Sequence, residues 1–314
     1  CHFVSLMAVV ALLSMCDEHS LIRKRLEFAK IAVEKIVDRT QLVRRQAMRL
    51  MKKLIETHPP IMNTLSLSRK LWSNSLKKIE EQVPDLTENQ DTLDVSAVEG
   101  AGFDKASGII DDGFLDTVNN RNDKADTPNQ QNIIFNTQST SKEQLFAAHA
   151  FITFTLKFID LVDRSIELAQ ILLSSRSKTD NLDAIDLLVY ADAFNIDSST
   201  NGIRSIMHLV WAKPDNDETN SVCKAVVDTY RDLFMQAPPQ LSAKDQARVI
   251  AENLIDLSRN ATQGELMSLE KLIELSVTSD YITVSVVSRL WGLYQSAQPI
   301  QISSRRGSAI ILSM

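Results

Sequence analysis

Seven cations in the first third of the chain have the residue types and spacing to bind a polyanion. Four of them follow one another at intervals of four, three and one residues, so a helix would place them on one side. The other three are consecutive and belong to the preceding helical segment. Lysine and arginine neutralise phosphates and release counterions without contacting base edges. The candidate contacts to a double-stranded DNA backbone are Arg23, Lys24, Arg25, Arg45, Arg49, Lys52 and Lys53.

The distribution of charge along the chain favours this DNA interpretation over a plain solvated helix face, which is the alternative. Residues 1–83 contain 15 Lys and Arg against 8 Asp and Glu, whereas residues 84–143 contain 4 against 12. Residues 144–314 are again acidic, with 15 against 20, and the whole chain has a net charge of −6. Only the first part of the chain is therefore expected to attract a polyanion.

No residue pattern indicates a catalytic centre. The sequence has no glycine-rich phosphate loop, no Gly-x-Ser-x-Gly and no His-Glu-x-x-His. Its five histidines lack metal-ligand spacing, and its three cysteines form no Cys-x-x-Cys pair. Asp183 and Asp186 share a helix face but have no base beside them, so we interpret them as a solvated face. The sequence predicts no enzyme, no catalytic residue, no metal, no cofactor and no small-molecule substrate.

The element that must position the second cation group is a helix expected within Asp38–Pro59. Rotation by about 100° per residue brings five apolar side chains to the side opposite the cations. These inner residues are Val43, Ala47, Leu50, Met51 and Leu54. The sequence His58-Pro59-Pro60 ends the helix, because proline lacks an N–H and restricts the residue before it.

The start of this stretch has the spacing of HEAT-type helical repeats. In that pattern Asp38 caps the turn, Arg44 pairs with it, and the small Ala47 lets a partner helix approach beside Val43. We exclude Arg44 from the phosphate contacts because the repeat needs it structurally.

The rest of the chain shows helical periodicity in a series of segments joined by short polar loops. Few glycines, many Leu, Ala, Ile, Lys and Glu, and no run of alternating strand residues favour helix throughout. We therefore predict an all-α HEAT-repeat α-solenoid of antiparallel helix pairs, with Asp180 capping the helix 182–194. The expected helices are 3–15, 21–37, 38–59, 61–82, 144–175, 182–194, 199–211, 221–235, 242–258, 264–276, 281–294 and 308–314.

Composition divides the chain into three parts. Residues 1–83 form basic N-terminal repeats, residues 144–314 form C-terminal repeats, and the solenoid is expected to continue beyond both ends. The intervening residues 84–143 are rich in Asp, Asn, Thr, Ser and Gly, so they bury too little apolar surface to fold. We predict a disordered acidic insertion there, with Thr127 before Pro128 as a candidate phosphosite, and an unmodified threonine as the alternative.

The N-terminal run Phe3–Met15 is apolar almost all round, which predicts a helix packed on both sides. It is too short to span a bilayer and has no basic leader, so we predict no membrane association. Three widely separated cysteines indicate a reducing compartment rather than a disulfide framework.

Four segments together resemble one family of helical-repeat proteins. They are RLEFAKIAVEKIVDRTQLVRRQAMRLMKKLIETHP (25–59), DAFNIDSSTNGIRSIMHLVWAKP (192–214), SVCKAVVDTYRDLFM (221–235) and ISSRRGSAIILSM (302–314). Their order and spacing resemble those of the condensin HEAT-repeat subunit, the D-type non-SMC regulatory subunit. The details are more similar to the condensin I form than to the condensin II form.

This resemblance implies a non-catalytic subunit that acts in mitotic chromosome condensation. It implies docking on the kleisin subunit, contact with the SMC ATPase heads and binding to double-stranded DNA in chromatin. It also implies a location in the nucleus and on chromosomes, and in the cytoplasm for part of the cell cycle. A protein-only HEAT scaffold, such as a nuclear transport receptor or a phosphatase scaffold, is the competing hypothesis.

Overall fold

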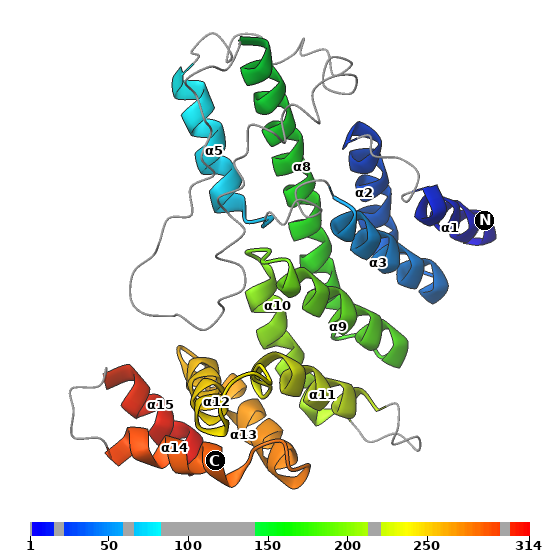
Figure 1. Cartoon of the computed structure of the whole chain (residues 1–314). Coiled ribbons are helices and arrows are strands. Elements are labelled where there is room, and N and C mark those ends of the chain that lie inside the picture. The colour runs from blue at the N-terminus through cyan, green and yellow to red at the C-terminus, as the bar shows by residue number, and fades with distance from the viewer. Residues whose placement is uncertain (1, 16–21, 59–65, 83–141, 213–220, 296–301) are drawn as a thin grey trace. The chain divides into compact units, whose positions relative to one another are not determined.

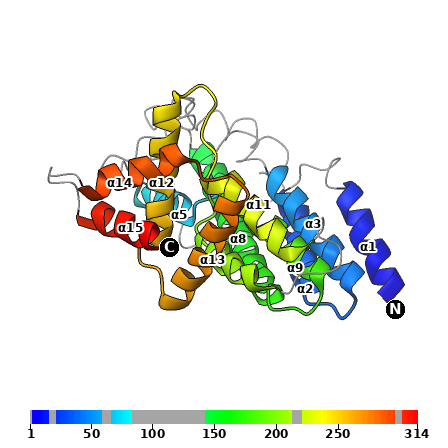
Figure 2. The ribbon, with the colours of Figure 1, turned by 90° about the horizontal axis from the view of Figure 1, so that it is seen from below.

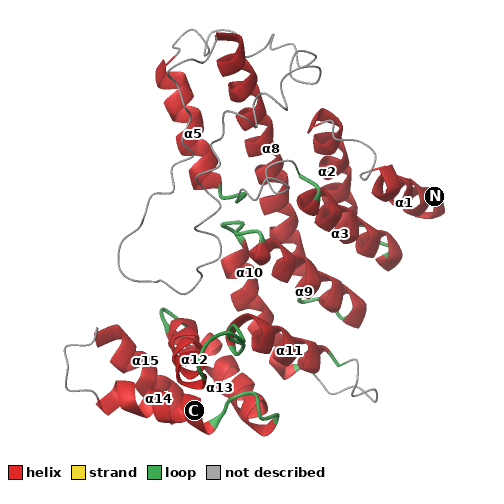
Figure 3. Ribbon diagram, viewed as in Figure 1, coloured by secondary structure: helices red, strands yellow, loops and turns green. Residues whose placement is uncertain are grey.

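The computed structural model describes residues 2–15, 22–58, 66–82, 142–212, 221–295 and 302–314. Throughout these ranges the regular structure is helical, and Figure 3 shows no strand among them. The predicted all-α fold is confirmed. The acidic insertion and its candidate phosphosite Thr127 lie outside the described residues, apart from Lys142 and Glu143 at the start of a helix.

The helices follow one another along the chain (Figure 1), and the residues between α5 and α8 lie outside the described ranges. They are α1 (His2–Met15), α2 (Ile22–Ile36), α3 (Gln41–Glu56), α5 (Arg69–Gln82), α8 (Lys142–Leu172), α9 (Lys178–Ala193), α10 (Ser199–Ile206), the 3₁₀ helix η3 (Met207–Trp211), α11 (Val222–Phe234), α12 (Ala243–Ser258), α13 (Gln263–Thr278), α14 (Val284–Gln295) and α15 (Ile302–Ser313).

The chain forms two compact units. The first contains Cys1–Ser175 and Asp186–Gly202, and the second contains Arg176–Ile185 and Ile203–Met314. In the first unit α2 packs on α3 and α8, α1 packs on α3, and α5 packs on α8. Figures 1 and 2 show α2 and α3 side by side from two directions. The first unit therefore joins α8, which follows the acidic insertion, to helices that precede it.

Helix α3 has the inner face that its periodicity predicts. The five predicted inner residues are all fully buried. Met48 and Ile55 are buried with them, so the apolar face is wider than predicted. The side-chain Oδ1 of Asp38 accepts a hydrogen bond of 2.9 Å from the Thr40 N–H, in the turn before α3. The Arg44 guanidinium donates to the main-chain oxygen of Asp38 at 2.8 Å.

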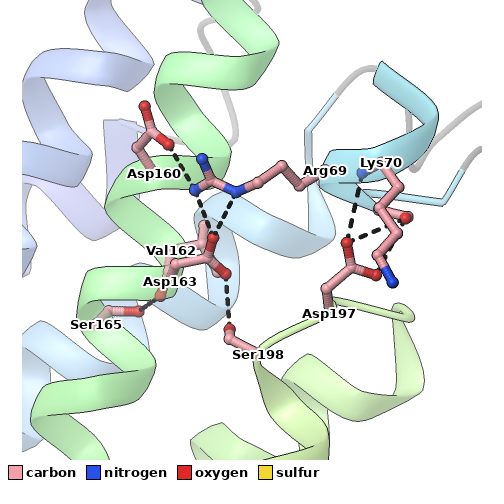
Figure 4. Close-up of polar contacts among 9 residues, drawn as sticks. Arg69, Lys70, Asp160, Val162, Asp163, Ser165, Asp197 and Ser198 are labelled. Carbon is pink, nitrogen blue, oxygen red and sulfur yellow. Dashed lines mark hydrogen bonds and ion pairs between the residues drawn. The ribbon is translucent and has the colours of Figure 1, made fainter. Parts of the chain in front are cut away.

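A polar junction fixes the start of α5 and explains why this helix begins later than predicted (Figure 4). Asp197, in the turn before α10, accepts hydrogen bonds from the Ser68 hydroxyl at 3.0 Å and from the Lys70 N–H at 3.4 Å. This distant carboxylate caps the first turn of α5, which begins at Arg69, whereas residues 61–65 of the predicted helix lie outside the described ranges.

Arg69 itself ties α5 to α8. Its guanidinium lies 2.5 Å from an Asp160 oxygen and 2.6 Å from an Asp163 oxygen, and these charge-assisted contacts raise the pKa of Arg69. The other oxygen of Asp163 accepts a 2.6 Å hydrogen bond from Ser198. The junction therefore links α5, α8 and the turn before α10 within the first unit.

Several helix boundaries differ from the prediction. Helix α9 starts at Lys178, where the Ser177 hydroxyl accepts from the Asp180 N–H at 3.4 Å, so Asp180 lies in the first turn and is not the cap. The segment 199–211 is split into α10 and η3. Helix α15 begins at Ile302, six residues before the predicted start.

The prediction for α1 is wrong in one respect. Val9 is buried, but Val4 and Met7 are 64% and 52% exposed, so one side of this helix is not covered in the structure. An apolar surface all round shows that a helix can be buried, but it does not determine how many neighbours cover it.

In the second unit α12 packs against α14 and α15, while α11 and α13 pack against η3. The Tyr230 side chain is fully buried, and its hydroxyl donates a 2.5 Å hydrogen bond to the Ile203 carbonyl oxygen. Gly307 permits the close packing of α15, because a Cβ there would lie 2.5 Å from Cγ2 of Ile255.

Candidate nucleic-acid interface

The outer side of α3 presents its cations to different degrees. Arg49 is exposed, and Arg45 is half-buried. Both residues lie opposite the apolar face that packs into the first unit, as the periodicity predicts. Arg49 is therefore the cation of this face that is most accessible to a phosphate.

Lys52 is held by residues of α9 that belong to the same unit. Its ammonium lies 2.5 Å from Oδ2 of Asp186 and 4.9 Å from the centre of the Tyr190 ring. Its side chain is only 24% exposed, whereas that of Asp186 is 62% exposed. The positive charge of Lys52 is thus locally compensated by a carboxylate 134 positions further along the chain.

Lys53 has a looser partner on its own helix. Its ammonium lies 3.6 Å from a carboxylate oxygen of Glu56, one turn further on. Exposed pairs at this spacing contribute only about 0.2–0.5 kcal/mol, so a phosphate competes with Glu56 at little cost.

The three consecutive cations of α2 do not act as one group. Lys24 is exposed, and the side chain of Arg23 lies outside the described part of the structure. Arg25 is a correction to the prediction, because its side chain is only 4% exposed and its Nη1 donates a 2.7 Å hydrogen bond to the Thr57 hydroxyl. It faces the core between α2 and the end of α3 and is not available to DNA.

The buried guanidinium of Arg25 affects its neighbour His58. The imidazole is fully buried and stacks on Phe158 with ring centres 4.2 Å apart. Burial, with a smaller contribution from the positive charge of Arg25, lowers the pKa of His58 to about 3. His58 is therefore neutral at physiological pH and belongs to the core rather than to the candidate interface.

Sequence analysis missed two kinds of residue here. Lys30 and Arg39 are exposed cations on α2 and in the turn before α3, and their charges alone would have nominated them. Asp186 was interpreted only as part of a solvated helix face, and Tyr190 was not singled out, because only the folded chain brings these two side chains to Lys52.

Two other kinds of site were searched for in the described ranges. No three of their His, Cys, Asp and Glu side chains are grouped so that they could hold a metal ion. No helix there combines the length and apolarity needed to cross a membrane.

Helices that pack on one another within each unit define an all-α helical-repeat protein. Its candidate site is a binding surface, the partly neutralised cationic face of α3. The chain is homologous to condensin complex subunit 1 over about nine-tenths of its length, as its four family-like segments predicted. No family model matches it.

Three relatives carry this conclusion. Condensin complex subunit 1 of Schizosaccharomyces pombe is 30% identical over 93% of this chain, and that of Saccharomyces cerevisiae is 32% identical over 94%. The condensin-1 complex subunit CAP-D2 of Arabidopsis thaliana is 24% identical over 89%. The chain spans 25%, 26% and 19% of the lengths of these proteins, consistent with a segment of a condensin D-type subunit.

Proposed function

We propose that this chain is part of a non-catalytic regulatory subunit of a condensin complex, of the condensin I form. The observation that carries the proposal is the match at 30% and 32% identity to two proteins named condensin complex subunit 1. The protein then acts in chromosome condensation, in the nucleus and on chromosomes, with a cytoplasmic pool during part of the cell cycle. Its partners are the kleisin subunit, the SMC ATPase heads and double-stranded DNA.

Within this role, we assign the DNA contact of the chain to the outer face of α3 and the start of α2. Arg49 and Lys24 supply exposed charge, Arg45 adds a half-buried guanidinium, and Lys53 exchanges its weak partner Glu56 for a phosphate. These groups bind the DNA backbone without reading its sequence, because phosphate contacts carry no direct base information.

Charge reversal tests the DNA surface. The variant Arg45→Glu/Arg49→Glu should bind duplex DNA more weakly, and its plot of log affinity against log salt should be flatter by about 1.8, at about 0.9 for each lost phosphate contact. The control is Lys77→Glu/Lys157→Glu, which makes the same charge change at exposed positions of α5 and α8. Fluorescence anisotropy with a labelled duplex measures both quantities.

Equal affinity and slope in the two double variants would remove this face as a DNA site and leave the protein-only scaffold hypothesis for this segment. The condensin assignment has its own test, which is purification of the full-length parent protein from dividing cells. Recovery of SMC ATPases and a kleisin with it supports the assignment, and their absence contradicts it.

A further inference from the structure

We infer that Asp186 masks Lys52, so that α9 limits the positive surface that α3 offers to DNA. The inference rests on the proposed DNA contact and adds a residue that opposes it. It follows from three observations: an ion pair, a cation–π contact and the unequal exposure of the two paired side chains.

The ammonium of Lys52 has two partners that approach it from α9. Asp186 Oδ2 lies 2.5 Å from Nζ, and the Tyr190 ring centre lies 4.9 Å from it. Asp186 and Tyr190 are four residues apart, so they lie on one face of the helix. A carboxylate and an aromatic face together hold the cation at one place, where each partner alone would leave a flexible lysine mobile.

The side chains of Lys52 and Asp186 differ in exposure, and this difference affects how a polyanion meets them. Lys52 is 24% exposed, but Asp186 is 62% exposed, so the outermost charge at this position is negative. A phosphate that approaches Lys52 must displace Asp186 and meets its repulsion first. Masking therefore removes one cation from the surface and adds one anion beside it.

Two ion pairs between residues of a single helix in the first unit have a different geometry. Lys53 and Glu56 are 3.6 Å apart on the same helix, where their side chains exchange readily with solvent. Arg164 and Glu167 on α8 are 2.6 Å apart but are equally exposed at 59% each. Glu167→Gln is thus a matched control for Asp186→Asn, since both remove one carboxylate charge from a close ion pair.

The first measurement needs no DNA. The full chain is treated with a limiting amount of an amine-acetylating reagent, and the modification of each lysine is followed by peptide mass spectrometry. Asp186→Asn should increase the acetylation rate of Lys52 about two- to fivefold, which corresponds to the strength of a partly exposed ion pair. Lys24 and Lys53 should not change. An unchanged rate at Lys52 overturns the masking, whatever the protein does with DNA.

The second measurement is duplex binding at several salt concentrations. Asp186→Asn should bind about two- to fivefold more tightly at low salt, with a salt slope steeper by about 0.9, and Glu167→Gln should match the wild type. Adding Lys52→Ala to Asp186→Asn should cancel the gain, while Lys52→Ala alone should weaken binding, because it leaves the exposed Asp186 carboxylate without its cation.

The two proposals fail in different ways. If acetylation of Lys52 rises but the affinity of Asp186→Asn does not, Lys52 lies outside the DNA surface and the inference is wrong. The Arg45→Glu/Arg49→Glu variant then decides the proposed DNA contact separately. A gain in affinity that persists in Asp186→Asn/Lys52→Ala also contradicts the inference, because it would come from general charge and not from Lys52.

Discussion

Two glycines in neighbouring helices should respond in opposite ways to the same substitution. Gly307 of α15 packs against α12, and an added Cβ would lie 2.5 Å from Cγ2 and 3.3 Å from Cβ of Ile255. Gly292 of α14 is exposed, and a Cβ there would meet no atom within 4 Å. Each change to alanine removes the same backbone freedom, so packing alone distinguishes the two positions.

The magnitudes follow from these contacts. Alanine is about 1 kcal/mol more favourable than glycine inside a helix, so Gly292→Ala should raise the free energy of unfolding by about 1 kcal/mol. Gly307→Ala has the same gain but also forces the β-branched, buried Ile255 to move, and such overpacking costs about 3 kcal/mol. We therefore expect Gly307→Ala to lower the free energy of unfolding by about 2 kcal/mol.

Urea unfolding followed by far-ultraviolet circular dichroism measures both variants, with the midpoint compared at constant m-value. The double variant Gly307→Ala/Ile255→Ala should lose less stability than the sum of its two single changes, because the smaller side chain makes room for the new methyl group. A Gly307→Ala protein as stable as Gly292→Ala would refute the close contact between α12 and α15.

Two further outcomes test the core and the polar junction. The pKa of His58 is 6.5 in the unfolded chain and about 3 in the folded protein, so between these pH values only the unfolded chain binds a proton at His58. The free energy of unfolding should therefore fall by about 1.4 kcal/mol per pH unit as the pH drops from 6.5 towards 3. The variant His58→Phe keeps a ring against Phe158, and its free energy of unfolding should fall less between pH 7 and pH 5 than that of the wild type, as measured by urea unfolding. An identical pH dependence in the variant and the wild type would contradict a buried neutral imidazole. Arg69→Met leaves Asp160 and Asp163 facing each other without a cation, so it should cost about 1 kcal/mol. A double-mutant cycle with Asp163→Asn should recover part of that loss, and strict additivity would argue against the pair.

The parts of the fold that the sequence predicted well depend on neighbours along the chain. Apolar residues at intervals of three and four identified the inner face of α3, and Val43, Ala47 and Leu54 are buried there. Capping is equally local, although no cap was predicted at these two positions: Ser221 and Ser242 accept hydrogen bonds from N–H groups in the first turns of α11 and α12. Such signals are local because helical hydrogen bonds and caps join residues only a few positions apart.

The candidate interface was predicted less well, since charge and spacing do not reveal partners. Arg25 has the same charge as Lys24, yet packing against the end of α3 buries one and leaves the other exposed. The start of α5 likewise depends on Asp197, more than 120 residues away.

By itself, the sequence determined that this is an all-helical repeat protein, which residues of α3 turn inward, and to which subunit it is related. Only the tertiary structure decided which cations remain accessible, because the carboxylate that neutralises Lys52 and the core that encloses Arg25 come from other helices. The apolar periodicity of a helix is a property of residues close together in the sequence, whereas a long-range ion pair forms only after packing has brought two helices together.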